Sequence, residues 1–192
     1  MKRLMDPKLA PNLRKRGLQM AQVPALDLTF AYFNMEDSLV GGYEPEKVAL
    51  RRAISLAYNS RDEIAIVRKG QAIPANTPYS PAVAGYDPNF RTSASEYSVP
   101  KARALLDMYG YVDRDGDGFR ERPDGSPLVL QNASTPSARD QQIDELWKRS
   151  MDDVGLRMTF KKAKWPDLLK ESNAGKLMMW QLGGSASSPD AD

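Results

Sequence analysis

The sequence predicts an α/β fold with a small, mostly parallel sheet flanked by helices. The chain has 192 residues, of which 41% are hydrophobic, and folding at this length buries roughly 70% of the surface that the unfolded chain exposes. Apolar residues recur at helical spacing in some segments and alternate with polar ones in others. The last third reads strand, helix, strand, helix, strand, a succession that pairs its strands in parallel through right-handed crossovers.

The first half of the chain predicts a basic helical entry, one strand and two further helices. Residues 7–16 form the entry, and apolar residues alternate over 26–32 with the period of a strand. Residues 46–58 place apolar side chains on one helical face, after a proline at a position where the first turn tolerates it. Ser60 is expected to cap a further helix, which is closed by Gly70.

A long loop precedes the regular elements of the second half. Residues 72–98 are rich in proline, serine, alanine and asparagine, and predict an ordered surface loop. After it, the spacing predicts a helix over 100–109, a strand over 128–131, a helix over 139–154, a strand over 156–161, a helix over 165–173 and a strand over 177–182.

The composition excludes several classes of protein. Lys and Arg number 27 and Asp and Glu 25, and this net charge of +2 argues against a nucleic-acid wrapper or a polybasic membrane binder. Without His or Cys, the chain cannot form a Ser-His-Asp triad, a cysteine nucleophile, or a metal site with histidine or thiolate ligands. The sequence has neither the run of roughly 18 apolar residues of a membrane span nor the apolar run of a signal peptide.

An acidic segment between a predicted helix and strand has the spacing of a calcium-binding loop. Oxygen-bearing side chains occupy positions 1, 3, 5, 9 and 12 of a 12-residue stretch with glycine at position 6: Asp113, Asp115, Asp117, Glu121 and Asp124. The last position holds Asp where a bidentate Glu is usual, and a strand rather than a helix follows. The alternative is a metal-free acidic turn. A calcium-dependent protein-interaction module is therefore a competing function.

Four segments of the sequence match motifs of a single family of bacterial proteins. The segment VALRRAISLAYNSRDEI at 48–64 is similar to a helix pair of that family, and YSVPKARALLDMYGY at 97–111 is similar to a second motif. The acidic loop followed by DGSPL at 124–128 resembles a third. LWKRSMDDVGL at 146–156, with Trp165 beyond it, resembles a fourth. All four occur in the family's order, and together they resemble the family 5 extracellular solute-binding proteins, the dipeptide, oligopeptide and nickel binders of bacterial ABC importers.

The resemblance implies a periplasmic-binding-protein-like lobe. Family members are longer and close two lobes over a solute, so residues 1–192 are expected to be the second, C-terminal lobe alone, excised from such a protein. The implied function is the substrate-binding component of an ABC transporter, which captures a peptide-like or other small solute in the periplasm and delivers it to the membrane permease. The resemblance also implies a protein without catalysis, with its signal peptide outside this fragment. We further expect a monomer that has no cofactor, unless the acidic loop binds calcium.

The implied solute site departs from that of the family's peptide binders. These carry Gly-Trp followed three residues later by an Asp that pairs with the peptide amine. Here the Gly-Trp pair corresponds to Gly183 and Gly184, and the acid corresponds to Ser185 or Ser187. The arginine that holds the carboxylate in dipeptide binders corresponds to Ser134. Because a buried charge without a counter-charge costs several kcal/mol, short zwitterionic peptides are disfavoured unless the other lobe supplies the charges.

Overall fold

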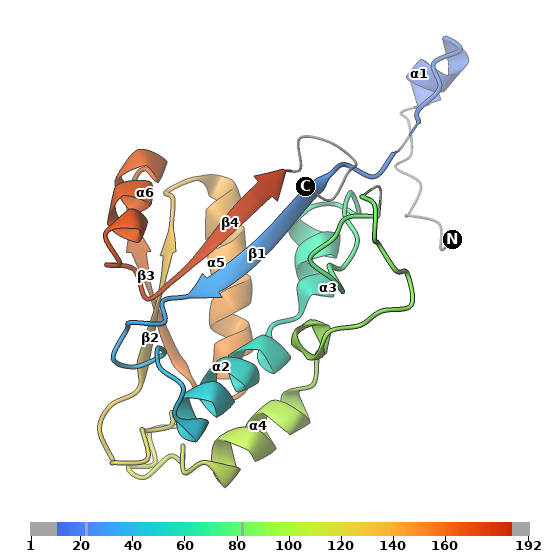
Figure 1. Cartoon of the computed structure of the whole chain (residues 1–192). Coiled ribbons are helices and arrows are strands. Elements are labelled where there is room, and N and C mark those ends of the chain that lie inside the picture. Colours follow the sequence, from blue (N-terminus) through green and yellow to red (C-terminus); the bar gives the residue numbers. More distant parts are fainter. Residues whose placement is uncertain (1–10, 22, 82, 186–192) are drawn as a thin grey trace.

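The computed structural model describes residues 11–21, 23–81 and 83–185, and shows a four-stranded sheet with helices on both faces (Figure 1). The strands are β1 (Asp27–Phe33), β2 (Val129–Ser134), β3 (Arg157–Lys162) and β4 (Met179–Ser185), in the order β1-β4-β2-β3. Strand β2 pairs in parallel with β3 and β4, which confirms the predicted crossovers, and β1 pairs antiparallel with β4.

The larger core lies on the face of the sheet that carries α2 (Pro45–Ala57), α4 (Val99–Met108) and α5 (Ala138–Asp152). Side chains along β2 alternate between the two faces: Leu130 joins this core, whereas Ala133 packs with α6 (Trp165–Asn173) on the other face. Helix α1 (Pro11–Lys15) lies away from the body of the molecule (Figure 1).

The predicted helical faces are confirmed most clearly in α5. The apolar residues expected to be buried on this helix are all less than a tenth exposed: Ile143, Leu146, Trp147, Met151 and, just after the helix, Val154. The Trp147 ring stacks on Tyr58 at a centroid distance of 4.0 Å and an interplanar angle of 22°. Each fully buried apolar side chain of this kind stabilises the fold by roughly 1.5–3 kcal/mol. The spacing of apolar residues therefore identified the helix and its buried face together.

Several boundaries differ from the sequence prediction. The cap of α3 (Ser60–Asp62) is Asn59, whose side chain accepts a hydrogen bond from the Arg61 backbone, so the assignment of the cap to Ser60 was wrong. The chain then continues as a π-helical turn, η1 (Glu63–Val67). Strand β2 runs three residues beyond its predicted end because it pairs with β3 over its whole length.

The segment over 72–98 is mostly irregular, as predicted, with one 3-10 turn, η2 (Ser93–Ser95). Its Ser80 hydroxyl donates a hydrogen bond to the Asp27 carbonyl at 3.3 Å, which joins the segment to the start of β1. None of the helices in the described part of the chain combines the length and apolar character needed to cross a membrane.

Candidate functional site

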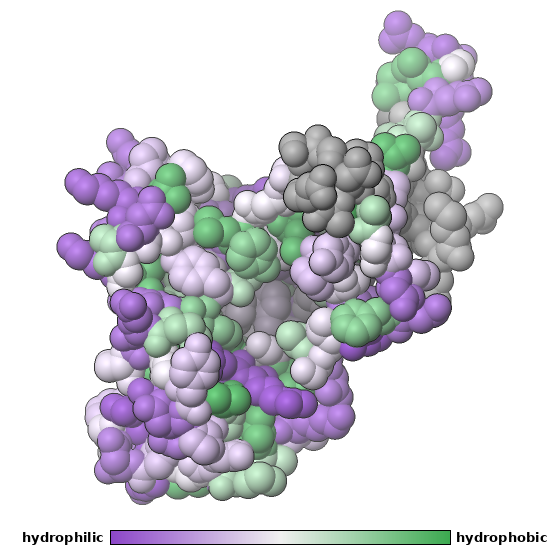
Figure 2. Space-filling model, in the orientation of Figure 1, coloured by the Kyte–Doolittle hydropathy of each residue, from purple (hydrophilic) through white to green (hydrophobic). Residues whose placement is uncertain are grey.

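The carboxyl ends of β2, β3 and β4 point to the same end of the sheet, which we call the carboxyl edge. Open α/β sheets bind their ligands at this end. Strand β2 ends at Ser134, β3 at Lys162 and β4 at Ser185. Since β1 runs antiparallel to β4, its first residue Asp27 lies at this edge as well, directly opposite Ser185. In Figure 2, the surface is hollowed near the middle of this view, beside β1 and β4 of Figure 1.

The three predicted ligand residues on β4 lie at this edge but not in a loop. Gly183, Gly184 and Ser185 continue β4 and pair with β1, so the predicted end of the strand at Leu182 was too early. All three are exposed, and a Cβ added at either glycine would meet no atom closer than 3.9 Å. The glycines therefore leave open space above the strand rather than relieve crowding. Ser187 lies outside the described residues.

The sequence reasoning missed an acidic side chain beside this strand. The Ser185 hydroxyl donates a hydrogen bond to the carboxylate of Asp27, and Asp27 is exposed. No ion pair to Asp27 is found within the described part of the chain. A carboxylate is thus present next to the position where the sequence showed only serine. Ser185 and Asp27 are 158 residues apart in the sequence and are brought together by the register of their two strands. No local sequence pattern could therefore predict this contact.

Ser134 lies at the same end of the sheet, but by register it is level with Gln181, four residues before Ser185, and its side chain points into the interior. It is 6% exposed, and its hydroxyl donates a hydrogen bond of 2.9 Å to Asp144 of α5. Asp144 also forms an ion pair with Lys162, which is the register partner of Ser134 on β3. Burial raises the pKa of Asp144 by more than the hydrogen bonds from Lys162 and Ser134 and the lysine charge lower it. A positive charge therefore stands beside the predicted arginine position, already balanced by a buried carboxylate.

A second buried carboxylate lies behind the same edge, on the π-helical turn. Glu63 is 5% exposed and accepts hydrogen bonds from the Tyr58 hydroxyl at 2.7 Å and from Arg68 at 2.8 Å. The side-chain amide of Gln181 on β4 lies 3.4 Å from it. Burial and then the neighbouring Glu63 charge raise the pKa of Tyr58, so this hydroxyl remains a hydrogen-bond donor. The network fixes η1 to the sheet where β4 approaches the edge.

Two of the basic side chains that line a hollow in the molecule form no ion pair with a described carboxylate. A hollow of about 340 Å³ is lined by Val67, Arg68, Lys69, Gln71 and Arg139. Arg68 is paired with Glu63, whereas Lys69 and Arg139 make no ion pair with a described residue. The hollow thus offers two cations, Lys69 and Arg139, that no described carboxylate pairs with.

The acidic loop lies at the opposite end of the strands, next to the start of β3. One ligand atom each from Asp113, Asp115, Asp117 and Glu121 lies within 4.8 Å of the others, a spacing that a divalent cation could bridge. Asp124 is not in this cluster: its carboxylate accepts hydrogen bonds from the hydroxyl and backbone of Ser126, which lower its pKa. The predicted five-residue ligand set is therefore reduced to four.

The same loop is also well bonded without a metal. The Asp113 carboxylate accepts hydrogen bonds from the Gly116 and Gly118 amides at 2.8 and 2.9 Å, and Asp117 forms an ion pair with Arg157 at 2.5 Å. Both the calcium loop and the metal-free turn proposed from the sequence are compatible with these contacts.

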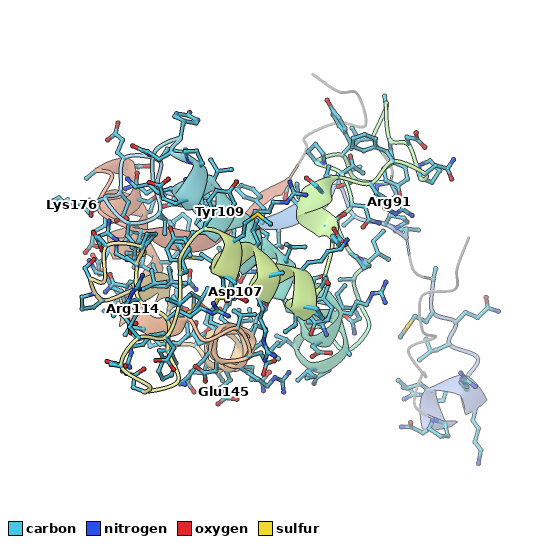
Figure 3. All side chains as sticks on the ribbon, turned by 90° about the horizontal axis from the view of Figure 1, so that it is seen from below. Arg91, Asp107, Tyr109, Arg114, Glu145 and Lys176 are labelled. Carbon is cyan, nitrogen blue, oxygen red and sulfur yellow. The ribbon has the colours of Figure 1, made fainter. Side chains whose placement is uncertain are left out.

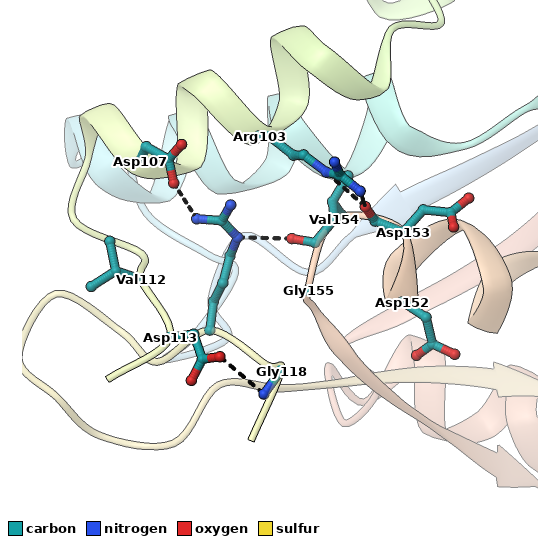
Figure 4. A pocket seen from close by; sticks show the side chains of 10 residues that line it. Arg103, Asp107, Val112, Asp113, Gly118, Asp152, Asp153, Val154 and Gly155 are labelled. Atoms are coloured by element: carbon teal, nitrogen blue, oxygen red, sulfur yellow. Dashed lines mark hydrogen bonds and ion pairs between the residues drawn. The ribbon is translucent and has the colours of Figure 1, made fainter. Parts of the chain in front are cut away.

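A hollow of about 320 Å³ beside the loop is crossed by two arginines (Figure 4). Arg120 forms an ion pair with Asp107 of α4 and donates to the Val154 carbonyl at 2.8 Å, and Arg103 donates to the Asp153 carbonyl at 2.9 Å. Viewed from below, α4 with Asp107 lies across this end (Figure 3). Because both arginines bond to groups of the protein itself, they connect α4, the acidic loop and α5. The hollow therefore has a structural role.

Comparison with known proteins finds a matching family model and two relatives similar in sequence. The model of the bacterial extracellular solute-binding proteins, family 5 (middle), matches residues 3–192. Di/tripeptide-binding proteins 2 and 4 of Pseudomonas aeruginosa are 29% and 26% identical over 145 and 129 residues, which are 73% and 67% of this chain. The chain spans about a quarter of the length of these relatives, 25% and 22% respectively.

The fold is similar to solved structures as well. The oligopeptide-binding protein AppA of Bacillus subtilis, solved in complex with a nonapeptide, superposes with a TM-score of 0.75 at 20% identity. The match covers 86% of this chain and 32% of AppA. The mixed α/β fold with its small sheet, predicted from the sequence, is thereby confirmed as a periplasmic-binding-protein fold.

Proposed function

Because the chain belongs to the bacterial extracellular solute-binding proteins of family 5, we propose that it forms one solute-facing lobe of the substrate-binding component of an ABC importer. The match over residues 3–192 is the observation that carries this proposal. Relatives named as di/tripeptide-binding proteins support a peptide as the solute. We propose that the full-length protein acts in the periplasm and delivers its solute to a membrane permease.

We propose that the carboxyl edge of the sheet is the surface that faces the solute. Gly183, Gly184 and Ser185 bring an open strand to this edge, and Asp27 adds an exposed carboxylate beside them. A carboxylate and a hydroxyl side by side suit a ligand ammonium group, which has three N–H donors and no acceptor. Binding, rather than catalysis, is the role that this arrangement supports.

The Asp27 carboxylate changes the class of solute that we expect the protein to bind. Short zwitterionic peptides were disfavoured because Ser185 and Ser187 carry no charge for the peptide amine. Asp27 supplies that charge from β1, so a peptide with a free amino terminus becomes the preferred solute. Ser134 donates its hydroxyl to Asp144, which makes its direct contact with a peptide carboxylate unfavourable. Lys69 and Arg139, which line one hollow, are the cations that we propose attract that carboxylate from solution.

The proposal is tested by calorimetric titration of the full-length protein with a tripeptide and with its N-acetylated counterpart, which lacks the ammonium group. We expect the free tripeptide to bind at micromolar affinity or better and the acetylated form at least about tenfold more weakly, a difference of about 1.4 kcal/mol. Asp27→Asn should weaken binding of the free tripeptide alone, and Asp37→Asn, outside the edge, should change neither affinity. Equal affinities for the two peptides in the wild type would exclude Asp27 as the amine partner.

The acidic loop supports a second proposal, a structural calcium ion. The cluster of four carboxylates within 4.8 Å is the specific observation in its favour. Asp113, Asp115, Asp117 and Glu121 would hold the ion, and the loop's position at the far end of the strands would give it a part in stability rather than in solute binding. The melting experiment described in the Discussion tests this proposal.

A further inference from the structure

Three buried side-chain atoms have no hydrogen-bond partner among the described residues. They are the Oδ1 atom of Asn132, the Oδ1 atom of Asp144 and the indole Nε1 atom of Trp147. All three residues are at most 5% exposed. Folded proteins pair nearly all buried polar atoms, either with protein groups or with ordered water. Each of these three atoms therefore requires a partner.

The three side chains belong to one interface, between β2 and α5. Side chains alternate along a strand, so Asn132 shares the face of β2 that carries Leu130 and Ser134. Leu130 packs in the larger core together with Trp147. The Ser134 hydroxyl donates its hydrogen bond to Asp144. Asn132 thus lies between two residues of β2 that both face α5.

The direction of α5 brings Trp147 level with Asn132. The helix connects the parallel strands β2 and β3, so it runs antiparallel to both. Asp144 contacts Ser134 at the end of β2, and Trp147 lies about 4.5 Å further along the helix axis, toward the start of the strands. Asn132 lies about 6.6 Å from Ser134 in the same direction. The carboxylate, the indole and the amide therefore border the same space.

The chemistry of the three atoms restricts what can bind there. The Oδ1 atoms of Asn132 and Asp144 accept hydrogen bonds, whereas the Nε1 group of Trp147 only donates. The indole N–H disfavours a metal cation, and the two oxygens disfavour an anion. A water molecule donates two hydrogen bonds and accepts others, and buried waters typically make about three bonds to otherwise unpaired groups. Water therefore matches the whole set.

We propose that one water molecule is bound between β2 and α5, where it donates to Asn132 and Asp144 and accepts from Trp147. The other carboxylate oxygen of Asp144 bonds to Ser134 and Lys162. The water thus completes the hydrogen bonds of a carboxylate that holds α5 to the carboxyl edge. This site goes beyond the proposed solute binding, because it lies inside the lobe and depends on no particular solute.

A crystal structure of the full-length protein, at a resolution that shows ordered water, tests the proposal. We expect one water at about 2.7–3.2 Å from each of the three atoms. The double variant Asn132→Leu/Trp147→Phe leaves one of these partners, fewer than the roughly two to four that a buried water needs, so the water should be lost. Gln131→Leu is the matched control, because Gln131 is the adjacent amide on β2 and is exposed. It should keep the water.

Nuclear magnetic resonance of the full-length protein gives a second readout in solution. The indole N–H signal that Trp147→Phe removes should show a nuclear Overhauser contact with water in the wild type and in Gln131→Leu. A direct hydrogen bond from Asn132 to Asp144 or Trp147 with no water between them, or an indole signal without contact to water, would overturn the proposal. If the double variant does not fold, the two wild-type measurements still decide. Neither readout requires a solute, so the failure of this proposal and that of the solute proposal are distinguishable.

Discussion

The contact between Ser134, Asp144 and Lys162 holds α5 to the carboxyl edge, and its removal has a calculable effect. Asp144→Ala leaves the Ser134 hydroxyl buried without its partner, and an unsatisfied buried hydroxyl costs about 1–3 kcal/mol. The Lys162 side chain is 37% exposed and can turn toward water, so the lost ion pair adds about 0–1 kcal/mol at most. At this chain length, each kcal/mol lowers the melting temperature by about 2–4 °C. The total cost of about 1–4 kcal/mol predicts a decrease of roughly 2–16 °C.

Asp144→Asn separates the hydrogen bond from the charge. The amide oxygen still accepts from Ser134, and the cost of burying a carboxylate disappears. Because the pKa of Asp144 is raised in the folded state, its protonated form is favoured there, and stability from this group is present at acid pH and lost as pH rises through the folded-state pKa. The asparagine variant should therefore melt at or above the wild-type temperature at pH 7, and this advantage should vanish below about pH 4.

The assay is thermal unfolding followed by circular dichroism between pH 3 and pH 8, with Glu145 as the matched control. Glu145 is the next residue on α5, carries the same charge and is exposed (Figure 3). Glu145→Ala and Glu145→Gln should change the free energy of unfolding by less than about 0.5 kcal/mol. If Asp144→Ala were no more destabilising than Glu145→Ala, the Ser134 contact would contribute nothing and the reasoning would be refuted.

Two further predictions concern the acidic loop and the isolated chain. If the loop binds calcium, millimolar Ca²⁺ should raise the melting temperature by mass action; Asp117→Ala should abolish this increment, whereas Asp124→Ala, outside the cluster, should keep it. An unchanged melting curve in all three proteins would leave only the metal-free turn. The 192-residue chain should bind no small solute at submicromolar affinity, since a lobe without its partner leaves the ligand open to water, and calorimetry showing such affinity would contradict the two-lobe proposal.

The sequence was most informative where burial repeats with a local period. The apolar face of α5 around Trp147 and Met151 predicted both the helix and its buried side. The alternation along β1 predicted the strand but not its packing, because Phe30 is 44% exposed whereas Ala31 and Phe33 pack against the larger core. The succession of strands and helices also predicted parallel pairing, because short crossovers leave few alternatives. Boundaries were less certain: hydrogen bonds to neighbouring strands extended β2 to Ser134 and β4 to Ser185 beyond their apolar cores.

The carboxyl edge of the sheet shows where sequence reasoning reaches its limit. The sequence alone determined the α/β class, the helical faces and the resemblance to solute-binding proteins, because these depend on residues close together in the chain or on the order of motifs. Only the tertiary structure placed Asp27 beside Ser185 and turned Ser134 toward Asp144. Both contacts join separate elements through strand register and helix packing, and a change of one residue in register would direct each side chain to the opposite face. The charge that the sequence reasoning found missing at this edge is therefore supplied by a strand from the other end of the chain.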